Sequence, residues 1–76
     1  MIIYVYDQAQ GDGGVYFVTY KGQPVLLASQ GGTFSTSDVD GSYCIIKNTN
    51  SHTVTFKNRI GFARPISILI TASDVK

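Results

Sequence analysis

The chain has 76 residues, of which 43% are hydrophobic and 14% charged, and its formal net charge is +1. This length allows a single domain, residues 1–76, with a small core, and the apolar composition excludes a disordered chain. Nucleic-acid-binding domains usually have a pI above about 9, whereas the sequence pI of this chain is about 7.9.

Three further classes are excluded by simple features of the sequence. The single cysteine, Cys44, forms no intramolecular disulfide and no cysteine zinc site. Residues 1–7 lack the basic and long apolar regions of a signal peptide. The longest apolar run, residues 66–70, is far shorter than the roughly 18 residues of a membrane span. We therefore expect no membrane span and, if Met1 is the native start, a cytoplasmic protein.

Turn residues divide the chain into short apolar segments. The absence of Glu and the abundance of Val, Ile, Thr, Tyr and Phe are typical of β-sheet. Residues 25–29 follow Pro24 and precede Gly31, which also fits a helix, but so few residues make a poor helix in water. The strands that we expect are 2–6, 15–20, 25–29, 33–35, 42–47, 52–57 and 66–71. Between the first two, residues 7–14 are expected to form a turn or loop.

The fold class predicted from this pattern is all-β: an antiparallel meander of six or seven short strands, closed as a barrel or folded as a small sandwich. Residues 52–57 and 66–71 alternate in polarity, with Val54 and Phe56 on one face and the isoleucines of 66–71 on one face. We expect these two segments to form a hairpin whose apolar faces pack together.

The connection between the last two expected strands carries basic and aromatic residues. No acidic residue occurs between Lys47 and Arg64, and the residues left at the tip of the expected hairpin are Lys57, Arg59, Phe62 and Arg64. Small β-barrels bind single-stranded nucleic acid through cationic grooves and aromatic side chains that stack on bases. These four residues are the candidate binding site, for nucleic acid or for a protein partner.

Catalysis has one candidate constellation. Cys44 and His52 fall on expected neighbouring strands and could form a nucleophile and base, but nothing supplies an orienting carboxylate or an oxyanion site. Asp38 and Asp40 match a calcium loop only in part, because Lys47 stands where a bidentate Glu is required. Residues 11–14, GDGG, lack the lysine and helix of a phosphate-binding loop. We expect no enzyme activity, no cofactor and no metal site.

The remaining hypothesis is a non-catalytic module for protein interaction or assembly. Residues 66–71, ISILIT, carry no charge and no proline, so at a sheet edge they would template pairing with another chain. Tyr4, Tyr6, Tyr16 and Tyr20 add side chains of a type enriched at interfaces. We therefore expect an interaction or assembly module in an oligomer or a phage-type assembly, with a single-stranded nucleic-acid-binding domain as the alternative and a Cys–His enzyme third.

One resemblance supports an assembly role. Residues 51–70, SHTVTFKNRIGFARPISILI, resemble the C-terminal strand–turn–strand of minor pseudopilins of type II secretion and competence systems. Val54, Phe56, Gly61, Ile66 and Ile68 fit that pattern, over about a quarter of the chain. The apolar N-terminal helix and the processing motif of that family are missing. The resemblance implies a pilus-type assembly subunit without an active site.

Overall fold

The computed structural model describes residues 1–71, which contain seven β-strands and no helix. Accordingly, no helix in that range could cross a membrane. The strands are β1 (Ile2–Asp7), β2 (Asp12–Phe17), β3 (Val25–Gln30), β4 (Phe34–Ser35), β5 (Tyr43–Ile46), β6 (Thr55–Asn58) and β7 (Ile66–Thr71). The all-β class predicted from the sequence is confirmed.

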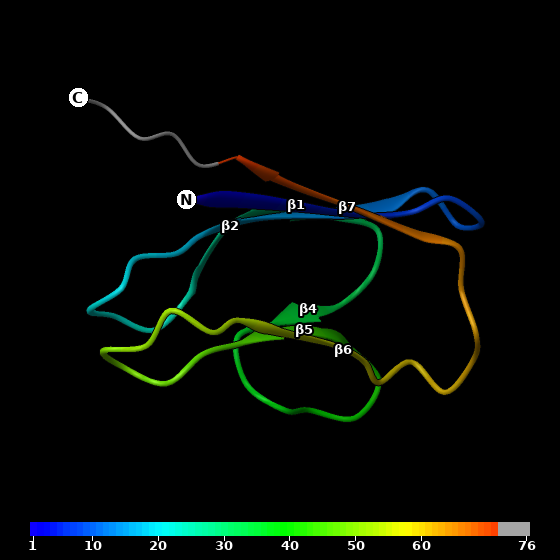
Figure 1. The fold of residues 1–76 in the computed structure, drawn as a ribbon. Coiled ribbons are helices and arrows are strands. Elements are labelled where there is room, and N and C mark those ends of the chain that lie inside the picture. The colour runs from blue at the N-terminus through cyan, green and yellow to red at the C-terminus, as the bar shows by residue number, and fades with distance from the viewer. Residues whose placement is uncertain (72–76) are drawn as a thin grey trace.

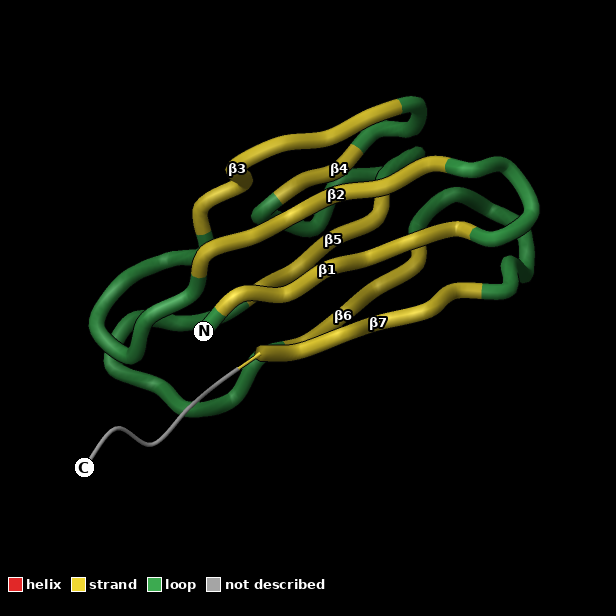
Figure 2. Tube along the Cα trace, turned by 90° about the horizontal axis from the view of Figure 1, so that it is seen from above, coloured by secondary structure: helices red, strands yellow, loops and turns green. Residues whose placement is uncertain are grey.

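The strands form two sheets that lie over each other as two layers (Figure 1). The four-stranded sheet has the order β3-β2-β1-β7 and is antiparallel throughout. The three-stranded sheet has the order β4-β5-β6, in which β4 and β5 are parallel and β5 and β6 antiparallel. Seen from above, β6 and β7 lie on the same side of the molecule (Figure 2). Within residues 1–71 the strands form two open sheets and do not close into a barrel.

The core lies between the two layers because the inward residues of both sheets are apolar. In β1, Ile3 and Val5 are buried while Tyr4 and Tyr6 are exposed, as strand alternation requires. The buried cluster comprises Ile3, Val5, Tyr16, Val18, Phe34, Tyr43 and Ile45, with Leu26, Val54, Phe56, Ile60 and Ile66 packed at its margin. Each sheet contributes residues to it, so neither sheet has a complete core alone.

The expected hairpin of residues 52–57 and 66–71 is wrong. β6 pairs with β5, whereas β7 pairs with β1, so the two strands belong to different sheets. Residues 59–65 carry the chain from one layer to the other, as Figure 1 shows. Alternation specifies which face of a strand is apolar but not which strand lies beside it. β1, whose own inward residues are Ile3 and Val5, is the partner of β7.

The meander expectation is also corrected, because β7 returns to pair with the first strand and β4 and β5 run parallel. Several strand boundaries differ from those expected, most of all at β2 and β6, and β2 ends at Phe17 and not at residue 20. β2 begins at Asp12, so residues 12–14 of the expected loop are in a strand, and β6 begins at Thr55, so His52 lies outside it. Glycine fits position 14 of β2 because it has no Cβ, and the ring of Phe34 occupies the space that a Cβ would need. The strand alternative for residues 25–29 is confirmed by β3.

Candidate interaction site

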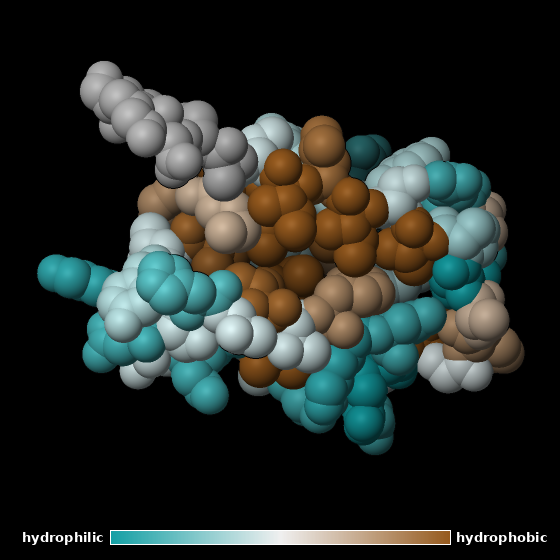
Figure 3. Space-filling model, viewed as in Figure 1, coloured by the Kyte–Doolittle hydropathy of each residue, from teal (hydrophilic) through white to brown (hydrophobic). Residues whose placement is uncertain are grey.

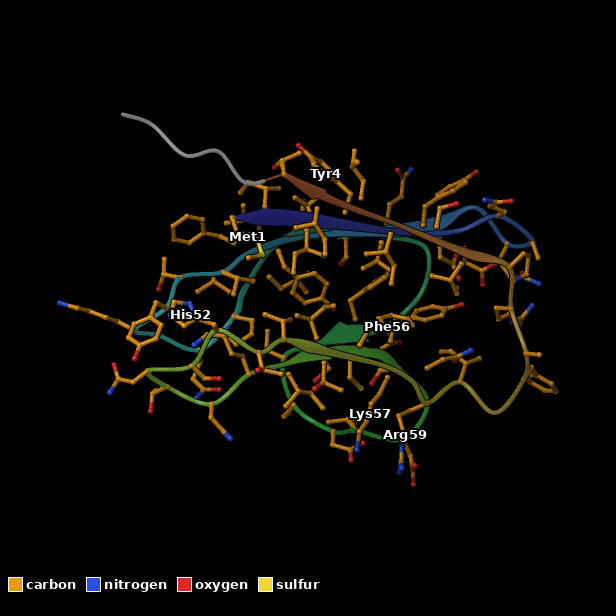
Figure 4. All side chains as sticks on the ribbon, in the orientation of Figure 1. Met1, Tyr4, His52, Phe56, Lys57 and Arg59 are labelled. Carbon is orange, nitrogen blue, oxygen red and sulfur yellow. The ribbon has the colours of Figure 1, made fainter. Side chains whose placement is uncertain are left out.

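Two of the basic residues singled out in the sequence are paired with aspartates. Lys57 Nζ lies 3.0 Å from Asp38 Oδ2, Arg59 Nε lies 3.2 Å from Asp38 Oδ1, and Arg59 also pairs with Asp40. The hydrogen bond from Lys57 and the neighbouring Arg59 guanidinium lower the pKa of Asp38 against its desolvation. Lys57 and Arg59 point away from the core (Figure 4). Two cations and two anions therefore form a locally balanced cluster.

The other two predicted residues lie together but have different neighbours. Phe62 is 68% exposed, and the Arg64 guanidinium carbon lies 5.4 Å from the centre of its ring. Arg64 Nε lies 3.8 Å from Asp7 Oδ2. The four predicted residues thus divide into Lys57 and Arg59, which face Asp38 and Asp40, and Phe62, which lies against Arg64. Of this second pair, Arg64 lies beside Asp7. The signal that sequence reasoning missed is the turn at residues 38–40, whose acids are distant in sequence from the basic cluster.

Cys44 and His52 have different neighbours. Cys44 is fully buried, and its Sγ lies 3.3 Å from Ser42 Oγ and 3.7 Å from the carbonyl oxygen of Val39. His52 is exposed, and its ring centre lies 4.4 Å from that of Tyr20. Within residues 1–71, no three His, Cys, Asp or Glu side chains gather as a metal site would require.

A buried carboxylate ties the two sheets together. The Tyr43 hydroxyl donates to Asp7, and the backbone N–H groups of Ala9 and Gln10 donate to Asp7 Oδ1 at 2.9 and 3.2 Å. These hydrogen bonds lower the pKa of Asp7, with that from Tyr43 having the largest effect. Burial and the hydrogen bond to Asp7 raise the pKa of Tyr43 to about 12. Asp7 therefore joins the two sheets through its hydrogen bond from Tyr43, although from the sequence we expected only a turn residue.

Lys47 also has a structural position. Its side chain is buried, and Nζ donates to the carbonyl oxygens of Tyr20, Asn48 and Ser51 at 2.8, 2.7 and 3.3 Å. These bonds join the turn after β2 to the turn after β5. Lys47 is consequently a buried structural residue and not part of the charged surface.

The largest apolar exposure on a single strand is on β7. Ile68, Leu69 and Ile70 are 43%, 60% and 55% exposed, and β7 is an outer strand of its sheet. Figure 3 shows a continuous hydrophobic area on this side of the molecule, between the two layers. Val54, Phe56 and Ile66, all partly buried, adjoin the same core. We call the outer edge of β7 together with Ile68, Leu69 and Ile70 the β7 edge.

The backbone groups available at the β7 edge follow from the pairing with β1. The N–H of Gln8 donates to the carbonyl oxygen of Pro65 at 2.9 Å, which makes these two residues a hydrogen-bonded pair. Because such pairs alternate along an antiparallel ladder, Ser67, Leu69 and Thr71 direct their backbone groups toward β1. Ile66, Ile68 and Ile70 then direct theirs outward, and within residues 1–71 no strand pairs with that side.

The other edges of the two sheets have features that oppose pairing, and the β7 edge does not. β3 has a register irregularity between its pairs to Val15 and Tyr16, β4 has two residues, and β6 carries Lys57. Bulges, short length and charges are the usual means by which natural proteins prevent strand addition. β7 has six residues and no charge. Among the edges formed by residues 1–71, it is the one best suited to accept another strand.

The outer face of the four-stranded sheet carries two exposed tyrosines, Tyr4 and Tyr6. Tyr4 and Tyr6 are 42% and 48% exposed and line a groove of about 420 Å³ with Gly13, Val15 and Ala28. Tyr4 lies on this outer face in Figure 4. Tyr16 differs from the other tyrosines expected at the surface, because it is fully buried and its hydroxyl donates to the carbonyl oxygens of Ser35 and Tyr43.

Comparisons with family models, curated proteins and solved structures find no match to this chain.

Proposed function

We propose that this protein is a non-catalytic interaction module that associates through strand addition at the β7 edge. The observation that carries the proposal is an uncharged, six-residue outer strand with three large exposed apolar side chains. An added strand would pair with the backbone groups of Ile66, Ile68 and Ile70 and cover their side chains. Recognition by this mode needs no catalytic group and no cofactor.

The two-layer arrangement supports this role. In our interpretation the sheets form a small sandwich that is open on the β6 and β7 side, where core residues meet solvent (Figure 3). A chain of this size buries only about 60% of the surface of its unfolded form, so additional burial at an interface would stabilise it. Assembly as an oligomer, or in a phage-type or pilus-type structure, would supply that burial. The resemblance of residues 51–70 to minor pseudopilins stays a prediction and adds no support here, because β6 and β7 lie in different sheets.

A photo-crosslinking amino acid at Leu69 tests the proposal in cells that make the protein. Leu27 on β3 is a matched control, because the two leucines are 60% and 55% exposed and lie on opposite outer strands. We expect a covalent adduct of defined mass from Leu69 and none from Leu27. The partner identified by mass spectrometry should then, as a purified protein, slow hydrogen exchange of the Ile66, Ile68 and Ile70 amides. No adduct from Leu69, or equal adducts from both positions, would refute the function.

Binding of single-stranded nucleic acid is the weaker alternative. Lys57 and Arg59 face Asp38 and Asp40, so the charge that would attract phosphates is locally balanced. Fluorescence anisotropy with a labelled oligonucleotide at low salt tests it, with a Lys57→Ala, Arg59→Ala and Arg64→Ala triple variant as the comparison. Tight, salt-dependent binding that the triple variant loses would favour nucleic acid over a protein partner.

A further inference from the structure

The outward backbone groups of β7 are spaced symmetrically about one residue. They belong to Ile66, Ile68 and Ile70, so Ile68 lies midway between the other two. Two copies of β7 in antiparallel orientation, related by a two-fold axis at Ile68, would place Ile68 opposite Ile68 of the second copy and Ile66 opposite its Ile70. Residues in such a hydrogen-bonded pair exchange both N–H···O bonds. Every outward group of the three isoleucines then has a partner.

The charge pattern also favours a second copy. β7 has no charged side chain, so two copies of it bring no like charges together. By contrast, β6 against its own copy would bring Lys57 near Lys57, and the register irregularity in β3 interrupts its edge. Of the edges formed by residues 1–71, β7 is the one whose own copy is a complementary strand.

The side chains of the three isoleucines strengthen the same arrangement. Ile66, Ile68 and Ile70 are opposite Asp7, Val5 and Ile3 of β1, which are buried, so they lie on the sheet face toward the second layer. The two-fold axis would place the hydrophobic area of Figure 3 against the same area of the other copy. A closed, two-fold interface of this type uses one surface patch twice.

We propose that the strand added at the β7 edge is β7 of a second copy of this chain, antiparallel and centred on Ile68, so that two four-stranded sheets become one continuous sheet. This proposal rests on the function proposed above and names its partner. Stable complexes bury at least about 1,000 Å² in total, and one six-residue strand edge with its apolar margin is a small interface on that scale. The dimer is therefore concentration-dependent.

Disulfide trapping tests the register. Cα atoms in a hydrogen-bonded antiparallel pair are about 5.5 Å apart, within the range of about 4.4–6.8 Å that a disulfide spans. Ile68→Cys should give a covalent dimer on mild oxidation. Ile70→Cys is the matched control on the same face: alone it should not link, but it should link when mixed with Ile66→Cys. The native Cys44 is buried and does not compete.

Sedimentation analysis tests the association itself. The mass of the wild-type protein should rise from 8.2 kDa toward that of a dimer as concentration increases. Ile68→Lys should raise the dimer dissociation constant by roughly tenfold or more, because it opposes two ammonium groups and removes apolar contact. Leu27→Lys on β3 should leave it unchanged. Circular dichroism reports whether each variant is folded. If Ile68→Lys does not fold, the cysteine variants, which add no charge, test the dimer in its place.

The outcomes separate this proposal from the function on which it rests. A wild-type protein that is monomeric at every concentration, or Ile70→Cys linking to itself as readily as Ile68→Cys, overturns the second copy and its register. If Leu69 nevertheless crosslinks to a different protein, the interaction function stands and its partner is foreign. If Leu69 gives no adduct and the protein is monomeric, both are overturned.

Discussion

Gly14→Ala should destabilise the protein although glycine is unfavourable within a strand. An ideal Cβ at Gly14 would lie 2.6 Å from Cδ1 of Phe34 and 2.9 Å from both Cγ and Cε1 of the same ring. Real Cβ atoms do not approach carbon so closely, so the ring must move. Phe34 is only 8% exposed, and its ring centre lies 5.1 Å from that of Tyr43, so its movement disturbs the core.

Gly13→Ala is the matched control. Its Cβ would have no neighbour closer than the carbonyl oxygen of Val5 at 3.8 Å, which is ordinary contact. Neither glycine has a positive φ. Both substitutions therefore gain the same about 0.4–1 kcal/mol from the restricted unfolded chain. Only Gly14→Ala adds the penalty for overfilling a packed core, about 1–3 kcal/mol, which is then the expected difference in unfolding free energy between the variants.

Urea and thermal unfolding, followed by circular dichroism, measure this difference. In a domain of this size each kcal/mol shifts Tm by roughly 4–8 °C, so the variants should be well separated. Phe34→Leu removes the ring that the new Cβ would meet, so in that background Gly14→Ala should lower the unfolding free energy by less. A double-mutant cycle measures this difference. If Gly14→Ala is as stable as Gly13→Ala, the contact between Gly14 and Phe34 does not hold β2 against the second layer.

Three further predictions concern the buried polar groups. Lys47→Met should lower the unfolding free energy by about 1–3 kcal/mol, because it leaves the three carbonyl oxygens bound by Nζ without that donor, whereas Lys57→Met should change it by only about 0–1 kcal/mol. The free energy of unfolding should fall as pH rises from 10 to about 12, because burial raises the folded-state pKa of Tyr16 and of Tyr43 from 10.0 to about 12. A raised folded-state pKa adds stability that is complete below the pKa of the unfolded state and is lost as pH rises through the pKa of the folded state. Chemical unfolding at stepped pH measures this, and constant stability across that interval would contradict the burial of the two hydroxyls. The Cys44 thiol should resist alkylation in the folded protein and react once urea unfolds it, so rapid labelling of the native state would contradict its burial.

Much of the fold was predictable because strand signals are local. The alternation of Ile3 and Val5 with tyrosines, and the apolar run of β7, are visible in the sequence, and the bounds of β7 were predicted without error. Boundaries at β2 and β6 were less accurate. At β2 this is because Gly13 and Gly14 have no strand propensity of their own; the space filled by Phe34 makes Gly14 the residue that fits there.

The candidate site was predicted less well, because charge partners are not local. Lys57 and Arg59 formed a cluster without acids in the sequence, but the fold places Asp38 and Asp40 beside them. The interaction hypothesis for residues 66–71 was made from composition. That β7 is an outer strand is a property of the sheet order, which the sequence did not reveal.

By itself the sequence determined that this protein is a small all-β domain. The period of two and the glycine-rich turns are local signals that act over a few residues, and the absence of Glu is a composition typical of β-sheet. Only the tertiary structure decided that residues 52–57 and 66–71 do not form a hairpin and that the chain crosses between them from one sheet to the other. The physical reason is that alternation fixes the apolar face of a strand, whereas its neighbour is chosen by the packing of both layers. That choice placed β7 beside β1 and left Ile66, Ile68 and Ile70 with outward backbone groups.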